Sequence, residues 1–334
     1  RAAAMALKSR VTLYMASPLF SEDSEDKWKQ AAEAAYDIIK QKTDLGLDLV
    51  PYPQIFNDVN NQKAEVILYR PTGESGDFEK ANFPIGVEGG KTSTCPTQNL
   101  MEAYDMKDGT PFVWNNQSNP YDNRDPRMKY TIVCNEMKWP VDPVEIWEGG
   151  TNGLPLQNAT TTGYYLKKYV NNTISFEAGS TVTKKQHNWV LFRYGEILLN
   201  YAEAMINAFH DPNYKDAVYN MSAREAVNQI RGRTNISLPG FPSDITEKDF
   251  VKRLKNERRV ELAFEGHRFW DVRRWKELGQ TANIYGVKIT KNNEVISYEK
   301  FLLETRAVTD NMYFYPIPNT ERFKNPNLGQ NPGW

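Results

Sequence analysis

The chain has 334 residues, with 41 Lys and Arg against 42 Asp and Glu, so its formal net charge is −1. This balance argues against a protein that binds nucleic acid through a basic surface. The length allows one large core, and the low net charge with 40% hydrophobic residues excludes a disordered chain. Two cysteines exclude a small disulfide scaffold. No apolar run approaches the roughly 18 residues that a membrane-spanning helix needs.

Residues 1–17 are expected to form the first helix, in which small residues alternate with Leu7, Val11 and Tyr14. Ser17-Pro18 ends it, because the residue before a proline disfavours helical dihedrals. The chain begins inside this helix without an initiator Met, and we expect it to be the C-terminal part of a longer precursor. Residues 25–42 are expected to form the second helix, so that 1–42 make a helical hairpin.

Residues 43–187 are expected to be a loop-rich insertion, because they hold 23 of the 39 Pro and Gly residues. Short strand-like runs lie within it at 130–133 and 164–166. Helical patterns return at 189–208, 215–232, 246–265 and 266–277, so that 188–277 form a helical scaffold. Residues 278–334 are expected to be irregular, with a Pro- and Asn-rich tail from 306.

The two helix pairs share a pattern of small and large residues. Ala32-x3-Tyr36-x2-Ile39 matches Ala223-x3-Val227-x2-Ile230. A small residue followed by a large one is typical of the second helix of a tetratricopeptide hairpin, although any amphipathic helix pair can give such a match. The pattern therefore predicts a mainly α fold: a tetratricopeptide-like helical-repeat scaffold with a long loop-rich insertion that contains short strands.

Three segments carry a family signature: Phe192-Arg193-Tyr194-Gly195-Glu196-Ile197-Leu198-Leu199-Asn200-Tyr201-Ala202-Glu203-Ala204, the run from Asn256 to Trp275, and the C-terminus from Tyr315 to Trp334. Weaker matches are Pro96–Leu100, Lys107–Gly109, Asn123–Arg127 and Thr162–Lys168. Together they resemble the SusD/RagB family of Bacteroidetes outer-membrane nutrient-binding lipoproteins. The matches run in family order over nearly the whole chain.

The resemblance implies one SusD-like domain over 1–334, incomplete at its N-terminus, with the ligand-binding region in 43–187. It implies a non-catalytic protein that binds oligosaccharides, or in some members oligopeptides, at the cell surface. The partner it implies is a SusC-like TonB-dependent outer-membrane transporter, on which such proteins sit as lids. The implied membrane attachment is an N-terminal lipidated cysteine, and neither Cys95 nor Cys134 lies near a chain start.

Three glutamates, Glu257, Glu261 and Glu265, follow one helix face at i, i+4 and i+8. A glycosidase needs two carboxylates across a cleft, whereas these are stacked on one helix. Several arginines lie close by in the sequence, so we expect an ion-pair network that fastens this region to its neighbours. The family resemblance points to the same structural role.

His267 and Asp271 have the i, i+4 spacing of two metal ligands, but no further ligand is evident. We therefore expect no metal site and interpret His267 as a hydrogen-bonded packing residue. Residues 122–125 lack the acidic count and the glycine of a calcium loop and are interpreted as a turn. Whether Cys95 and Cys134 form a disulfide stays open. No motif predicts a cofactor.

Aromatic side chains next to amides are the remaining candidates for a ligand site, because sugar rings stack on aromatic faces and hydroxyls need polar partners. Six residues of the insertion meet this description: Trp114, Asn115, Asn116, Trp147, Phe83 and Phe78. By contrast Trp189, Trp270 and Trp275 stand among apolar neighbours on expected helices and are predicted to be core.

The leading hypothesis is a receptor that captures oligosaccharides and delivers them to the transporter. An oligopeptide receptor of the same family is the alternative, and exposed tryptophans favour sugar over peptide. A glycoside hydrolase and a scaffold that binds only protein are further alternatives. Two carboxylates across the ligand cleft would support the hydrolase.

Overall fold

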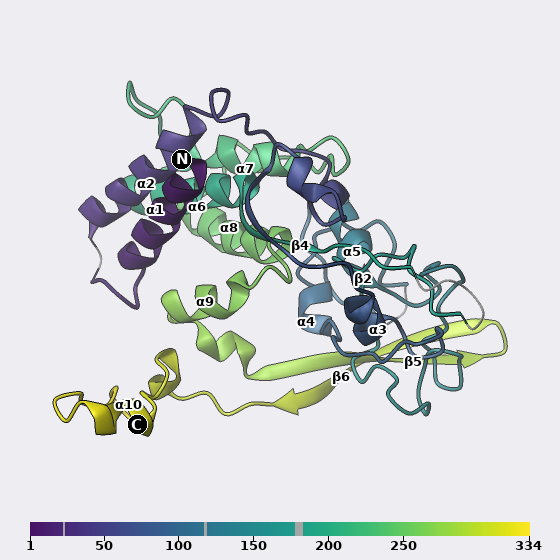
Figure 1. Ribbon diagram of the computed structural model, residues 1–334. Coiled ribbons are helices and arrows are strands. Elements are labelled where there is room, and N and C mark those ends of the chain that lie inside the picture. The colour runs from purple at the N-terminus through teal and green to yellow at the C-terminus, as the bar shows by residue number, and fades with distance from the viewer. Residues whose placement is uncertain (23, 117–118, 178–182) are drawn as a thin grey trace.

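A computed structural model describes residues 1–22, 24–116, 119–177 and 183–334. Helices fill one half of the molecule, and a loop-rich half with a long β-hairpin extends from it (Figure 1). The helices are α1 (Ala2–Ala16), α2 (Glu25–Ile39), α3 (Asp77–Asn82), α4 (Gln98–Met101), α5 (Pro126–Thr131), α6 (Tyr194–Phe209), α7 (Ala223–Arg231), α8 (Glu247–Glu261), α9 (His267–Arg274) and α10 (Asn319–Lys324). Short 3-10 turns are η1 (Tyr52–Ile55), η2 (Asn60–Gln62), η3 (Leu278–Thr281) and η4 (Asp310–Tyr313).

Within these described ranges, the strands form three separate antiparallel pairs. β1 (Val66–Pro71) pairs with β4 (Asn188–Arg193), β2 (Ile132–Val133) with β3 (Tyr165–Leu166), and β5 (Asn283–Asn292) with β6 (Val295–Thr305). The β1–β4 pair ties the two ends of the insertion together, whereas the β2–β3 pair joins two segments inside it.

The scaffold is built on α6, which packs against α1, α2, α7 and α8. Every apolar side chain of its central turns is buried, and small residues allow the helices to approach: Ala32 and Ala35 of α2 have no exposed surface. Tyr36 of α2 stacks on Tyr201 of α6, with ring centroids 5.5 Å apart. This arrangement confirms the mainly helical, tetratricopeptide-like fold that the small–large pattern predicts.

Local sequence signals explain where the helices begin. Ser222 and Glu225 form a reciprocal capping box at the start of α7. The hydroxyl of Thr246 accepts a hydrogen bond from the Asp249 backbone N–H at the start of α8. Asp125 caps α5, whose first residue is a proline, so the turn expected at 122–125 leads into a helix.

Two expectations about secondary structure are wrong. Residues 188–193, of which 189–193 are expected to be helical, form strand β4, because Val190 and Phe192 face the core while Leu191 is exposed. The segment 278–334 is not irregular throughout, since it contains the β5–β6 hairpin. Val287 and Ile289 alternate with Lys288 on β5, and Asn293 in the turn adopts a left-handed φ of 50°.

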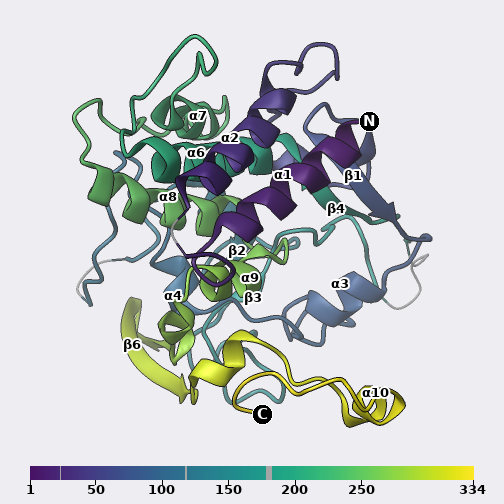
Figure 2. The same ribbon diagram turned by 90° about the vertical axis from the view of Figure 1, so that its left-hand side faces the viewer.

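Separate hydrophobic clusters serve the two halves. One holds α1, α2, α6, α7 and α8 together, and a second joins the insertion to the hairpin through residues such as Tyr164, Val287 and Tyr298. Within the part of the chain that is described, no helix is long and apolar enough to cross a membrane. Viewed from the helical side, α1 lies at the front and the C-terminal segment runs below α9 (Figure 2).

Candidate ligand-binding site

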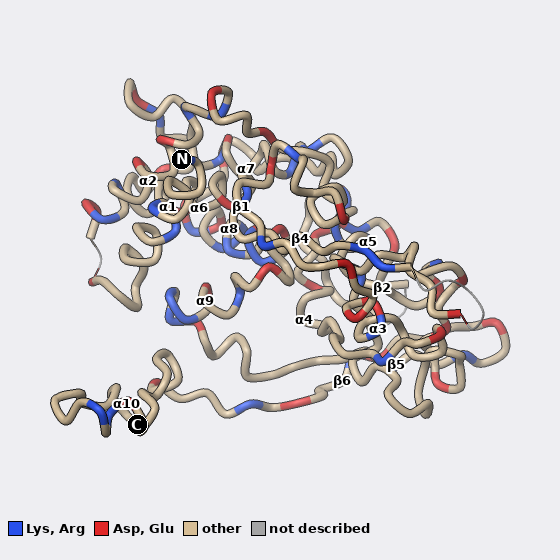
Figure 3. Tube along the Cα trace, in the orientation of Figure 1, with Lys and Arg blue, Asp and Glu red and all other residues tan. Residues whose placement is uncertain are grey.

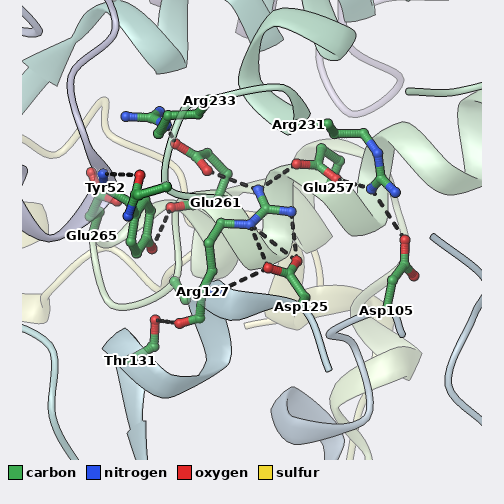
Figure 4. A network of polar contacts seen from close by, with 12 residues as sticks. Tyr52, Asp105, Asp125, Arg127, Thr131, Arg231, Arg233, Glu257, Glu261 and Glu265 are labelled. Carbon is green, nitrogen blue, oxygen red and sulfur yellow. Dashed lines mark hydrogen bonds and ion pairs between the residues drawn. The ribbon is translucent and has the colours of Figure 1, made fainter. Parts of the chain in front are cut away.

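An ion-pair network joins the insertion to the scaffold (Figure 4). Arg127, on α5 of the insertion, contacts Asp125 of its own turn and both Glu257 and Glu261 of α8. Its Nη1 lies 2.9 Å from Glu261 Oε2. Arg231 Nη1 contacts the second Glu257 oxygen at 2.7 Å. The two glutamates are thus shared between an arginine of the insertion and arginines of the scaffold.

The network continues beyond the end of α8. Arg193 bridges Glu65, Glu261 and Glu265 at 2.7–2.8 Å, and Lys168 Nζ lies 2.8 Å from Glu265 Oε1. Burial alone would raise the pKa of Glu265, but the charges of Arg193 and Lys168 outweigh it and lower that pKa to about 2. These carboxylates are ionised and fully engaged, as the structural interpretation of the three glutamates predicts.

The cations that hold the glutamates come from distant segments rather than from the nearby arginines. Of those neighbours, Arg258 and Arg274 belong to a second network, in which both contact Asp271 at 2.8 Å and Arg274 also contacts Glu203. His267 is buried beside it, 3.4 Å from Arg258 Nη2. The packing role expected for His267 is confirmed.

Trp114 and its amide neighbours lie on a loop at the edge of the insertion. Trp114 is half-buried, its indole N–H donates to Asn116 Oδ1, and its ring meets Phe112 edge-on at 6.4 Å. Asn115 and Asn116 are exposed. The loop therefore presents one half-buried aromatic ring beside amide groups.

Phe78 and Phe83 have different surroundings. Phe83 is 1% exposed within the insertion core, so its ring offers no surface for stacking. Phe78 is half-buried and packs edge-on against Trp189 at 4.9 Å and His187 at 5.3 Å. Of the two, only Phe78 contacts a residue that lines a cavity, namely His187.

Trp147 is half-buried on a third part of the surface, where Lys291 Nζ of the hairpin lies 4.6 Å from its ring centroid. The six sequence candidates thus occupy separate regions instead of one site. The three tryptophans predicted to be core differ in burial: Trp275 is buried and Trp189, on β4, is half-buried. The prediction is wrong for Trp270, which is 50% exposed.

A cavity of about 390 Å³ in the insertion brings aromatic and polar side chains together. Four aromatic side chains line it: Phe56, Trp139 and Tyr169, which keep only 6–8% of their surface exposed, and Tyr130, which is half-buried. Polar lining comes from Asn57, Asp58, Lys167, Lys168, Asn171, Asn172, Thr173, Lys185 and His187. These residues come from four short segments between positions 53 and 187, so spacing along the sequence does not reveal them. Among these lining residues, Trp139 is the aromatic side chain that sequence reasoning could have singled out, because Pro140 follows it. The structure shows a cis peptide bond between the two.

The polar groups of this cavity are held in place. Lys167 Nζ lies 4.9 Å from the Trp139 ring centroid, and burial lowers the pKa of Lys167. Asp58 pairs with Lys185 at 3.5 Å. His187 stacks on Trp189, and its Nε2 lies 3.0 Å from Glu79 Oε1. The cavity thus offers fixed hydrogen-bonding groups around apolar rings, which suits a hydroxylated ligand with apolar C–H faces.

Neither cysteine is bridged: Cys95 is half-buried and Cys134 is buried, and both are free thiols. Burial raises the pKa of Cys134 to about 12, so its thiol is protonated and unreactive at neutral pH. Over the described ranges, no group of three or more His, Cys, Asp or Glu side chains is placed to hold a metal ion.

Comparison with known proteins agrees with this architecture. The model of the SusD family matches residues 54–334. SusD-like protein P2 of Formosa agariphila is 29% identical over 163 residues, which are 47% of this chain and 28% of that protein.

Two crystal structures from Bacteroides fragilis NCTC 9343 superpose closely. One, of a SusD-like protein, has a TM-score of 0.80 and 26% identity over 100% of this chain and 65% of its own. The other, of a SusD-like carbohydrate-binding protein, has a TM-score of 0.77 and 24% identity over 98% and 64%. The chain therefore spans about two thirds of these structures and under a third of the curated relative. It belongs to the SusD family.

Proposed function

We propose that this protein binds oligosaccharides at the bacterial cell surface without catalysis and delivers them to a SusC-like TonB-dependent transporter. The observation that carries the binding role is the cavity around Trp139. Its rings supply apolar faces, and its amides, hydroxyl and lysines supply partners for sugar hydroxyls. One solved relative with this fold is described as carbohydrate-binding, and another as a surface glycan-binding protein from Bacteroides fluxus.

The carboxylates favour binding over hydrolysis. A glycoside hydrolase holds two carboxylic groups roughly 5 to 10 Å apart across the scissile bond. Among the described residues that line the Trp139 cavity, Asp58 is the one acidic side chain, and it pairs with Lys185. Glu257, Glu261 and Glu265 are buried in ion pairs and face no cavity ligand. These arrangements favour binding over bond cleavage.

An oligopeptide remains the alternative ligand. A peptide is recognised chiefly through its backbone, by a strand edge or a ladder of amides. Asn57, Asn171 and Asn172 supply amides, but the four aromatic side chains around them favour a sugar. Delivery to a transporter and attachment to the outer membrane through a lipidated N-terminal cysteine rest on membership of the family.

Isothermal calorimetry of the complete protein against a panel of plant, host and microbial oligosaccharides and mixed oligopeptides tests the proposal. We expect heat with one glycan class. The Asn172→Ala variant should weaken that binding several-fold, because it removes an exposed amide at the cavity without touching the core. Asn319→Ala, an exposed amide on α10, is the matched control and should bind as the wild type does.

Trp114→Ala in the same titrations decides whether the exposed loop takes part. A loss with Trp114→Ala and none with Asn172→Ala would move the site from the cavity to the loop. Heat with peptides alone would overturn the oligosaccharide proposal. Copurification with a TonB-dependent transporter from native outer membranes tests the delivery role, and its absence at every salt concentration would contradict it.

A further inference from the structure

A second cavity, of about 490 Å³, lies where α8 faces the loop after α4 and the start of α9. Its lining is strongly basic: Lys248, Lys252, Arg253, Lys255, Arg259 and Arg268. Figure 3 shows basic residues along α8 and α9 in this part of the molecule. No role in the fold described above accounts for this concentration of positive charge.

The three acidic residues of the cavity are already engaged. Glu277 contacts Lys255, and Glu102 contacts Lys300 at 2.8 Å. Asp105 lies 3.2 Å from Arg231 and 3.5 Å from Arg253. The remaining cations of the cavity therefore face no free carboxylate of the lining.

Arg259 differs from the buried arginines of the two ion-pair networks, each of which contacts a carboxylate. Among the residues that the structure describes, none forms a hydrogen bond or ion pair with its guanidinium. Arg268 beside it donates to Gln280 Oε1 at 2.7 Å and contacts no carboxylate in the same described part. Burial and the charge of Arg268 lower the pKa of Arg259 to about 10. Two half-buried guanidinium groups held close together repel each other, and an anion between them would relieve that cost.

An aromatic edge completes the cavity on the side of the insertion. Phe112 lines it, with the Arg124 guanidinium 3.6 Å from its ring centroid, and Trp114 lies against Phe112. A ligand whose anionic group meets Arg259 would thus have an aromatic wall within the same cavity for an apolar face. Paired guanidinium groups suit a carboxylate or a sulfate, which they can bind in bidentate fashion.

We propose that this cavity is a subsite for an acidic saccharide, in which Arg259 and Arg268 hold a carboxylate or sulfate on a sugar ring that lies against Phe112. The inference rests on the proposed function and narrows it from oligosaccharides in general to charged ones. Lys248 and Lys252, both exposed at the cavity, add attraction that draws an anionic ligand in.

The test is calorimetry of the complete protein with matched pairs of probes. One pair is a galacturonic acid tetramer and its carboxyl-reduced neutral form; the other is a sulfated carrageenan tetrasaccharide and its desulfated form. We expect the acidic member of one pair to bind about tenfold or more tightly than its neutral counterpart, with an advantage that shrinks as salt rises. The pair that shows it identifies the source of the charge.

Arg259→Gln should abolish that advantage, and Arg259→Lys should retain part of it. Lys252→Gln, on the exposed side of the same cavity, keeps the test informative if Arg259→Gln unfolds, and should reduce the advantage several-fold. Arg306→Gln is the matched control, because Arg306 is half exposed, pairs with Glu304 and does not line this cavity.

Equal affinity for both members of each pair, with neutral binding still lost in Asn172→Ala, would overturn this inference and leave the proposed function standing. Binding of no saccharide at all would overturn both. Tighter binding of a glutamate-rich peptide than of either acidic sugar would assign the cavity to a different ligand class and also overturn it.

Discussion

Arg127 is one of the side chains that tie the insertion to the scaffold. It is 1% exposed and contacts three carboxylates, two of them on α8. Replacing it with Gln leaves Glu257 and Glu261 short of a cation in a buried site. We expect Arg127→Gln to lower the free energy of unfolding by about 3–5 kcal/mol. Urea denaturation followed by circular dichroism measures it, and Arg306→Gln should change stability by less than about 0.5 kcal/mol.

As pH is lowered from neutral, His267 should cause the first loss of stability. Burial lowers its pKa to about 4, so between pH 6.5 and 4 the unfolded chain binds a proton that the folded protein does not. Stability therefore falls as pH drops through this window, by up to about 3 kcal/mol. Glu265, with its pKa of about 2, adds a second loss from about pH 4.5 downward as its ion pairs are protonated.

Thermal melting at intervals from pH 8 to 3 checks this order. In His267→Gln the decline between pH 6.5 and 4.5 should flatten, while the decline below pH 4.5 should stay. An unchanged profile in that variant would show that His267 does not govern the first loss.

At the scale of elements, the hairpin depends on a close approach to the insertion. Gly163 has a φ of 82°, and a Cβ there would stand 2.4 Å from the Val287 carbonyl oxygen of β5. The backbone N–H of Val287 donates to Thr162 O at 3.0 Å in the same contact. Gly163→Ala should therefore push β5 outward and destabilise the protein by about 1–3 kcal/mol. Gly279→Ala, where a Cβ meets nothing within 4 Å, is the control.

Hydrogen exchange locates that effect. Amides of β5 and β6 should exchange faster in Gly163→Ala, while amides of α6 should keep their protection. Equal loss of protection everywhere would mean that the hairpin is not the element that yields.

Sequence reasoning succeeds for the elements whose information is local. The periodicity of α1, α2, α6, α7, α8 and α9 places each helix, and the small–large pattern predicts how the pairs pack. It fails for β4, since the alternation of Val190 and Phe192 leads without a break into the helical pattern of α6. It fails for the Trp139 cavity because four distant segments build it. Trp270 misleads because its position on a short helix gives no sign of which face is covered.

At the scale of the whole molecule, the outer face of α1 is apolar. Leu7, Val11 and Met15 follow one another at i, i+4 and i+8 and are each 50–52% exposed. The helix itself lies at the front of the view in Figure 2. Contiguous exposed apolar surface promotes association, so we expect the chain 1–334 to self-associate as its concentration rises.

Replacing Leu7 and Val11 with Gln should reduce that self-association, measured by light scattering over a concentration series. Val295→Gln, at the tip of the hairpin, removes an isolated apolar side chain that is 67% exposed and should have no such effect. Equal scattering by wild type and double variant would show that α1 does not drive association.

The shared glutamates of α8 also have a consequence for how the protein responds to its ligand. Arg127 and Lys168 of the insertion form ion pairs with Glu257, Glu261 and Glu265. The loop-rich half therefore cannot separate from the helical half without leaving these buried carboxylates unpaired. The two halves should melt in one cooperative transition despite their separate hydrophobic clusters. A sugar bound between Asn172 and Trp139 would then stabilise helices that it never touches. Binding in the cavity would raise the free energy of unfolding of the whole scaffold.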